Sequence, residues 1–169
     1  MKLEMKAIKH SEFASEETYC YEAAVYVDGK PFALVGNDGH GGCDRVYPHQ
    51  KFNGAFQKEL RELGAYFKSL PKSDPCELFP DGLDQSFEGW CHEQVMNHLI
   101  RKDMKRDLAK GVLYMDDEKL MFVKYARYKK MTKEIASIAA QKDKNLFGKQ
   151  ILNLMPECDA FAEYKLAID

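Results

Sequence analysis

The chain has 169 residues, of which 45% are apolar and 31% charged, and its formal net charge is −2. These values are typical of an ordinary globular protein and argue against a low-complexity or strongly basic chain. No apolar run approaches the roughly 20 residues of a membrane-spanning helix, and the N-terminus lacks the apolar core of a signal peptide. We therefore expect a single globular domain over residues 1–169 that has no membrane partner.

The cysteines favour a reducing compartment. There are five of them, an odd number, and no two have CxxC spacing. They are Cys20, Cys43, Cys76, Cys91 and Cys158. This pattern argues against a disulfide framework and for free thiols. The expected location is therefore cytoplasmic.

Charge is unevenly distributed along the sequence. Residues 101–150 hold 14 Lys and Arg against 7 Asp and Glu, whereas the rest of the chain holds 11 against 20. Such a split is typical either of a solvated surface or of a face for nucleic acid or another acidic partner. The candidate residues of that face are Arg101, Lys105, Arg106, Lys124, Arg127 and Lys129. Tyr125 and Tyr128 interleave with them and would suit base stacking, although Asp103 and Asp107 interrupt the helix and can pair with its basic residues.

The N-terminal third predicts strands. Met1–Ile8 alternates apolar and polar residues, which indicates a half-buried strand. Two runs rich in aromatic and β-branched residues, Tyr19–Val27 and Lys30–Val35, flank Asp28-Gly29. Asp-Gly between two such runs is a strong hairpin signal, because a type I′ turn needs positive φ at both central residues.

The middle of the chain predicts two helices. After Pro48, apolar residues recur at steps of three and four up to a helix end near Ser69. These residues are Phe52, Phe56, Leu60, Leu63 and Phe67. Pro71–Gly82 is rich in proline and indicates a surface connection. A second helix is expected from about Ser86, with Gly111 as its C-cap.

The last third predicts a second hairpin and two helices. Val112–Met115 and Leu120–Tyr128 are the expected hairpin arms, Thr132 can cap a short helix, and Asp159–Ala167 suits a closing helix. Strands and helices do not alternate as βαβ units. We therefore expect an α+β fold in which an antiparallel sheet from two β-hairpins packs against about four helices.

The most distinctive stretch is Gly36–Arg45, called the glycine loop below. It contains four of the eleven glycines, and it follows the first hairpin directly. Glycine-rich turns can aim several backbone N–H groups at an anion, so the loop is a candidate site for a nucleotide or another small anionic ligand. The candidate ligand-binding residues are Asn37, Asp38, Gly39, His40, Gly41, Gly42 and Arg45. The pattern matches neither a P-loop nor a dinucleotide-binding fingerprint.

The same loop contains side chains that could hold a metal. His40, Cys43 and His49 are the candidate ligands, and zinc is the metal that these ligand types would suit. Structural zinc sites usually show two paired ligand clusters, and only one pair is visible here. We therefore expect no cofactor.

A cysteine–histidine enzyme is a further alternative. Cys43 beside His40 or His49 could form a thiolate–imidazole pair, and Asp38 or Asp44 could orient the histidine. No nucleophile elbow or other strong catalytic motif is present. The sequence leaves enzymatic activity open and favours a protein without it.

Two patterns resemble a family of small proteins of bacteria and their phages. Asp28–Pro31 followed by the Asn37–Gly42 stretch is similar to one segment of that family. A basic helix, a hairpin at Val112–Val123 and the run Ile151–Pro156 before a last helix are similar to another. The resemblance implies a phage or mobile-element setting and carries no catalytic role that could be transferred to this chain.

These observations lead to one preferred function and the two alternatives above. We expect a small non-enzymatic binding protein of phage type, whose partner is a host protein or a nucleic-acid-processing complex. Inhibition of a defence system is one such role, and direct binding of nucleic acid is another. The sequence itself does not identify the partner.

Overall fold

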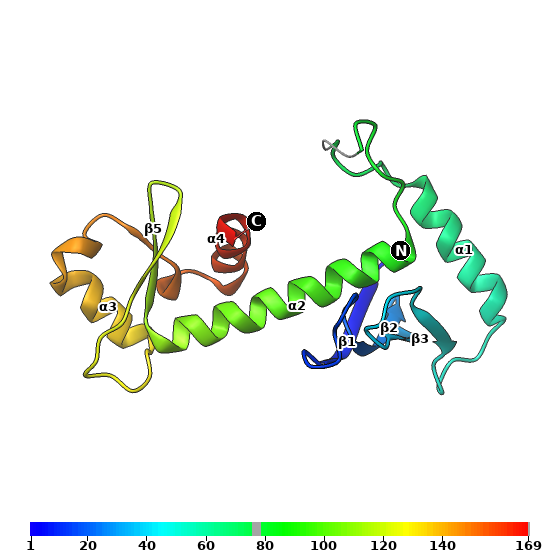
Figure 1. Cartoon of the computed structure of the whole chain (residues 1–169), viewed down its shortest axis with the longest axis horizontal. Helices are drawn as coiled ribbons and strands as arrows, with labels where there is room; N and C mark the ends of the chain where they lie inside the picture. The colour runs from blue at the N-terminus through cyan, green and yellow to red at the C-terminus, as the bar shows by residue number, and fades with distance from the viewer. Residues whose placement is uncertain (76–78, 169) are drawn as a thin grey trace. The chain divides into compact units, whose positions relative to one another are not determined.

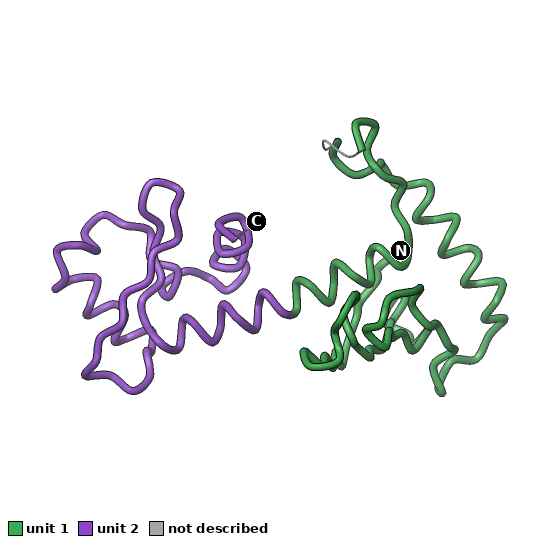
Figure 2. Tube along the Cα trace, in the orientation of Figure 1, with its two compact units in different colours: residues 1–98 green, residues 99–169 purple. Residues whose placement is uncertain are grey.

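The computed structural model describes residues 1–75 and 79–168, so Cys76 lies outside the described residues. The chain forms two compact units, Met1–His98 (unit 1) and Leu99–Asp169 (unit 2), which are coloured separately in Figure 2. The longest helix, α2 (Phe87–Lys110), contributes its first half to unit 1 and its second half to unit 2. Folding of residues 1–169 as one domain stays a prediction.

Unit 1 is built on a four-stranded antiparallel sheet. Its strands lie in chain order (Figure 1) and are β1 (Leu3–His10), β2 (Tyr21–Val27), β3 (Lys30–Asn37) and β4 (Arg45–Pro48). The predicted hairpin between β2 and β3 is confirmed, since Asp28 and Gly29 have φ of 49° and 79°. Both values lie in the left-handed region that a type I′ turn requires.

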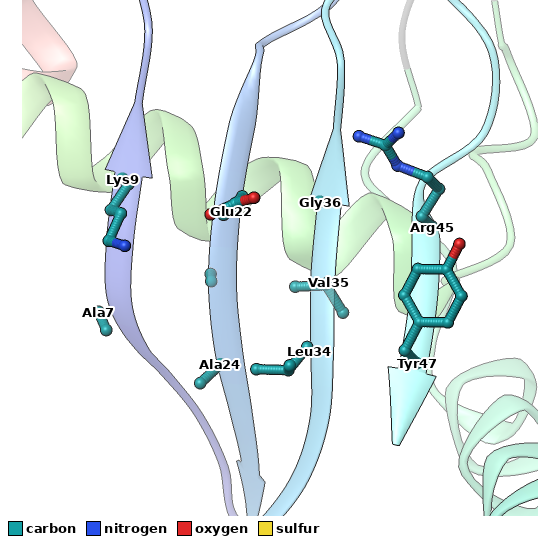
Figure 3. A pocket seen from close by; sticks show the side chains of 10 residues that line it. Ala7, Lys9, Glu22, Ala24, Leu34, Val35, Gly36, Arg45 and Tyr47 are labelled. Atoms are coloured by element: carbon teal, nitrogen blue, oxygen red, sulfur yellow. The ribbon is translucent and has the colours of Figure 1, made fainter. Parts of the chain in front are cut away.

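Helices cover one face of this sheet. The side chains of Tyr21, Ala23 and Val25 are buried, as are Cys91 and Val95 of α2. The second helix of the unit is α1 (Phe56–Ser69), whose first residue packs against Phe32 at a ring-centroid distance of 5.3 Å. In the described residues of unit 1, no helix lies on the opposite face, and Figure 3, which looks onto that face, shows α2 passing behind the strands.

Unit 2 contains a second, smaller antiparallel sheet in the order β6-β5-β7. The strands are β5 (Val112–Asp116), β6 (Lys119–Val123) and β7 (Gln150–Ile151). The helices are the second half of α2, α3 (Lys133–Lys142), α4 (Glu157–Ile168) and the short turns η1 (Lys144–Leu146) and η2 (Leu152–Leu154). Thr132 caps α3 as predicted, because its hydroxyl accepts a hydrogen bond from the Ile135 N–H.

The central strand β5 supplies residues to both cores of unit 2. Val112 packs with residues from the α3 side, including Met131 and Ala136, whereas Leu113 packs with Met104 and Tyr164 of α2 and α4. This division follows from the two-residue period of a strand, which turns successive side chains to opposite faces. The first two residues of β5 are therefore buried on opposite faces, whereas Met121 and Phe122 of the edge strand β6 are exposed.

The α+β class expected from the sequence is confirmed, and each predicted hairpin lies in its own sheet. Most boundaries differ from the prediction by one or two residues, and the larger differences are that α1 begins at Phe56 and that β6 ends at Val123 rather than near Tyr128. Gly111 follows α2 without positive φ. Its lack of a side chain matters because a Cβ there would lie 2.5 Å from the Val123 carbonyl oxygen. Among the helices of residues 1–75 and 79–168, none combines the length and apolar character needed to cross a bilayer.

Two tyrosines of unit 2 predict a loss of stability at alkaline pH. Burial and a hydrogen bond to Asp107 raise the pKa of Tyr164 to about 12, and burial with a bond to Asp143 does the same for Tyr125. An unfolded tyrosine titrates near pH 10. The unfolded chain therefore loses these protons first, and the free energy of unfolding should fall as the pH rises from about 10 to about 12. Urea titrations followed by far-UV circular dichroism across this range would measure the fall.

The variant Tyr164→Phe separates this effect from general alkaline denaturation. Phenylalanine keeps the packing of the ring and removes the titrating hydroxyl, so the dependence of stability on pH should become shallower between pH 10 and 12. An unchanged slope in this variant would show that Tyr164 does not contribute.

Candidate functional site

The glycine loop is fixed to the segment that precedes β2. The carbonyl oxygen of Gly39 accepts hydrogen bonds from the N–H groups of Glu16, Glu17 and Thr18 at 3.0, 2.8 and 3.3 Å. Gly39 has a φ of 89°, which glycine adopts without steric cost. One carbonyl therefore organises three residues that lie more than twenty positions earlier in the chain.

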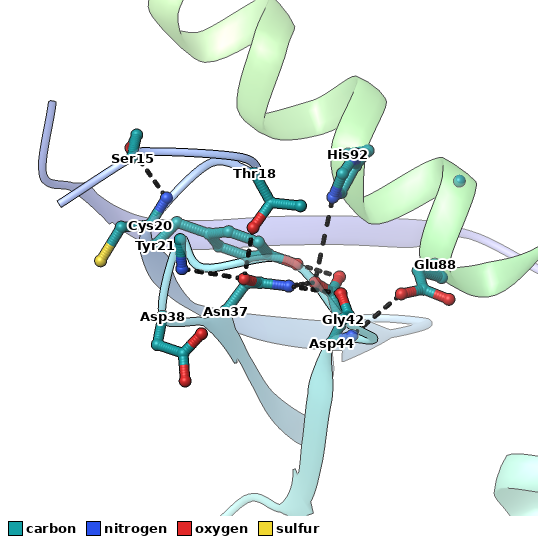
Figure 4. A network of polar contacts seen from close by, with 12 residues as sticks. Ser15, Thr18, Cys20, Tyr21, Asn37, Asp38, Gly42, Asp44, Glu88 and His92 are labelled. Atoms are coloured by element: carbon teal, nitrogen blue, oxygen red, sulfur yellow. Dashed lines mark hydrogen bonds and ion pairs between the residues drawn. The ribbon is translucent and has the colours of Figure 1, made fainter.

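The side chain of Asn37 forms hydrogen bonds that hold the glycine loop together. Its side chain is 3% exposed, and its oxygen accepts bonds from the Thr18 hydroxyl at 2.7 Å and the Gly39 N–H at 2.9 Å. Its amide nitrogen donates to the Gly42 carbonyl and to Asp44 Oδ1, both at 3.1 Å (Figure 4). The side-chain hydrogen-bonding groups of this predicted ligand residue are thus used within the loop and on Thr18.

Two backbone N–H groups of the predicted ligand-binding residues also have partners within the loop. The Gly39 N–H donates to Asn37, and the His40 N–H lies 3.4 Å from Asp38 Oδ1. A phosphate nest needs such N–H groups free and converging on one point. The small-ligand hypothesis for the glycine loop stays a prediction, and this geometry does not add to its support.

Asp44 is the buried acid of the loop. Its side chain is 2% exposed and accepts a hydrogen bond from the Tyr21 hydroxyl in addition to the bond from Asn37. Burial and the bond to Asp44 raise the pKa of Tyr21, so the hydroxyl stays protonated and donates. The backbone N–H of Asp44 donates to Glu88 at 2.9 Å, and its Oδ1 lies 4.0 Å from Nε2 of His92 (Figure 4). Asp44 therefore joins the loop to the first half of α2.

The candidate metal ligands have separate contacts. His40 Nδ1 lies 3.3 Å from Glu16, whereas His49 packs against Tyr26 and its Nδ1 accepts the Lys51 N–H. Cys43 is exposed. Within the described part of the chain, no group of three or more His, Cys, Asp and Glu side chains could hold a metal ion. The structure thus gives no geometric support to a zinc site at these residues.

The cysteine–histidine alternative gains no pair from the geometry either. Both histidines proposed to activate Cys43 contact the other groups just named. Cys91 lies near Asp44, and burial raises the pKa of its thiol, which disfavours the thiolate needed for nucleophilic attack. The enzyme alternative stays a prediction.

The open face of the unit 1 sheet carries a groove with a volume of about 460 Å³ (Figure 3). Small residues, Ala24 and Gly36, lower its floor, and Lys9 and Arg45 stand on the outer strands. Arg45 is the predicted ligand residue that lines it, and its guanidinium is only 3.8 Å from Asp38. The register places Glu22 between the two cations, so the groove combines both charge signs.

Three of the predicted basic-face residues are paired with acids in unit 2. Arg101 and Lys105 lie 3.3 and 2.9 Å from Glu157, and Arg106 lies 2.7 Å from Asp103. These carboxylates neutralise the cations locally and lower their attraction for an external anion. These three residues of α2 therefore differ from the other predicted basic-face residues in having acidic partners.

The remaining candidates belong to the stretch Lys124–Lys133, called the basic segment below. Its basic side chains are all exposed, and none forms an ion pair within 4.0 Å in the described residues; they are Lys124, Arg127, Lys129, Lys130 and Lys133. The segment is held in place by the Met131 N–H, which donates to the Ala109 carbonyl at 2.8 Å, and by the Tyr125–Asp143 bond of 2.6 Å. It is thus a loop, together with the first residue of α3, that presents five exposed positive charges.

No family model, curated protein or solved structure matches this chain. Its function must therefore be inferred from the two units themselves.

Proposed function

We propose that the protein is a binding protein that contacts the phosphate backbone of a nucleic acid through the basic segment of unit 2. This contact is the means by which it would engage a host nucleic-acid-processing complex. The observation that carries the proposal is the set of five exposed basic side chains that form no ion pair within 4.0 Å among the described residues. The phage setting and the inhibition of a defence system rest on the sequence resemblance and stay predictions.

The distribution of charge supports this proposal. Unit 1 contains 10 Lys and Arg against 16 Asp and Glu, whereas unit 2 contains 15 against 11. Unit 2 is therefore basic, although the overall charge of the chain is −2. Cations that have no carboxylate partner can replace the counterions condensed on a nucleic acid, and the release of those ions drives binding.

Removing two free lysines should weaken nucleic-acid binding and its salt dependence together. In the double variant Lys124→Ala and Lys129→Ala, we expect about a tenfold loss of affinity near 0.1 M salt. The slope of log K against log salt should also fall by about 1.5 to 2. Fluorescence anisotropy with a labelled oligonucleotide over a series of salt concentrations would measure both quantities.

The matched control removes two cations that both contact the carboxylate of Glu157. The double variant Arg101→Gln and Lys105→Gln has the same change in formal charge, and its salt slope should change by less than half as much as in the lysine pair, because both cations contact Glu157, whose single carboxylate offsets part of their charge. Equal losses in the two variants would contradict the assignment to the basic segment. Absence of binding by the unmodified protein at 0.05 M salt would contradict the proposed function.

A further inference from the structure

An exposed aromatic ring lies next to the basic segment. Phe122 is the fourth residue of β6, and 47% of its surface is exposed. The ring packs against the backbone of Gly111, since a Cβ on that glycine would lie 2.6 Å from Cε2 and 2.7 Å from Cζ of Phe122. One side of the ring is therefore held by backbone while much of its surface stays open to solvent.

Exposed lysines for which the described residues show no ion pair lie near this ring in the chain. Lys110 precedes Gly111 directly, and Lys124 follows Phe122 by two positions. The bond from the Met131 N–H to the Ala109 carbonyl brings Lys130 to the same end of α2. The basic segment and the ring thus lie around the C-terminal end of that helix.

The tyrosines that the sequence suggested for stacking are in a different position. Tyr125 and Tyr128 pack against the core that contains Met131, and the Tyr125 hydroxyl donates to Asp143. Arg127 lies over the Tyr128 ring, with its guanidinium carbon 4.8 Å from the centroid. In the described residues, Phe122 has no such aromatic or cationic partner on its exposed surface.

We infer that the ligand of this surface is single-stranded nucleic acid, with Phe122 as the ring on which a base stacks. The inference rests on the proposed function, because the lysines supply the contact to phosphate. An unpaired base can lay its face on the exposed ring, and phosphates on either side of that base can reach Lys110 and Lys124. In a duplex the base faces are already covered by neighbouring bases, so the ring adds nothing there.

The test compares strands and variants in the full-length protein. The probes are a fluorescein-labelled 20-nucleotide oligothymidine and a labelled duplex of 20 base pairs. Phe122→Leu keeps an apolar side chain over Gly111 and removes the aromatic face, so affinity for oligothymidine should fall about tenfold while the salt slope stays unchanged. Affinity for the duplex should not change, and Met121→Leu on the neighbouring exposed position should leave both affinities as they are.

A second variant keeps the test decisive if leucine perturbs the fold. Phe122→Trp retains an aromatic face and adds a fluorophore whose emission should be quenched when oligothymidine binds, at an affinity equal to or above that of the unmodified protein. Oligothymidine binding that is unchanged in Phe122→Leu and unaccompanied by quenching in Phe122→Trp would overturn the inference. If the lysine pair variant still weakened binding in that case, the proposed phosphate contact would stand without the stacking ring.

Discussion

Replacing Gly39 with alanine should destabilise unit 1 by about 3 to 5 kcal/mol, the largest effect of any single change in the glycine loop. Two costs combine. Alanine is strained at a φ of 89°, and its Cβ would overlap the carbonyl oxygen of Ala14, which is backbone and cannot rotate away. Relief of the overlap would also break the hydrogen bonds that the Gly39 carbonyl accepts. Urea unfolding followed by the fluorescence of Trp90, the only tryptophan and a residue of unit 1, would measure the loss.

Gly42→Ala is the matched control for this prediction. Gly42 has a nearly identical φ of 87°, but a Cβ there would meet no atom within 4 Å. Only the backbone strain remains, so the expected cost is about 1 to 2 kcal/mol. Equal destabilisation by the two variants would show that the contact with Ala14 does not matter.

Replacing Asp44 with alanine should cost about 2 to 4 kcal/mol. The change leaves the buried Tyr21 hydroxyl without its acceptor and removes one of the two acceptors of the Asn37 amide. A buried polar group that loses its partner pays its full desolvation cost, which exceeds the value of an average exposed hydrogen bond. Trp90 fluorescence reports this variant as well, since α2 carries both Trp90 and the Glu88 and His92 side chains near Asp44.

Asp38→Ala provides the comparison within the same loop. The Asp38 side chain is 56% exposed and lies 3.8 Å from Arg45, so its removal should cost less than about 1 kcal/mol. Asp44→Asn should fall between the two, because an amide oxygen can still accept from Tyr21. If Asp38→Ala and Asp44→Ala had the same effect, burial of Asp44 would not be the cause.

Patterns that depend on neighbouring residues were predictable from the sequence. The Asp28-Gly29 turn indicated the first hairpin, the Thr132 hydroxyl capped α3, and three- and four-residue spacing located α1. Each rests on interactions between residues a few positions apart, where steric preference and periodicity act directly. The α+β class followed from the order of these elements.

Contacts between distant residues could not be predicted in this way. The bond from the Asp44 N–H to Glu88 spans 44 positions, and no local pattern connects the two. Strand β4 was missed because it has only four residues, although Val46 and Tyr47 are typical strand formers. The count of charges along the sequence did not distinguish Arg101 and Lys105 from Lys124. Only the structure shows that Glu157 lies beside Arg101 and Lys105. Phe122 could have been noticed as an aromatic residue within two positions of Lys124, but its exposure depends on packing against Gly111.

The internal bonding of the glycine loop has a consequence for how such sequences diverge. Selection at Asn37, Gly39 and Asp44 would act through folding, because these positions hold the loop, the segment before β2 and α2 together. Gly42 would accept asparagine, which also populates positive φ. A motif maintained for this reason can persist while the partner changes. The residues that are substituted when the partner changes would then lie elsewhere, among the exposed side chains of the basic segment.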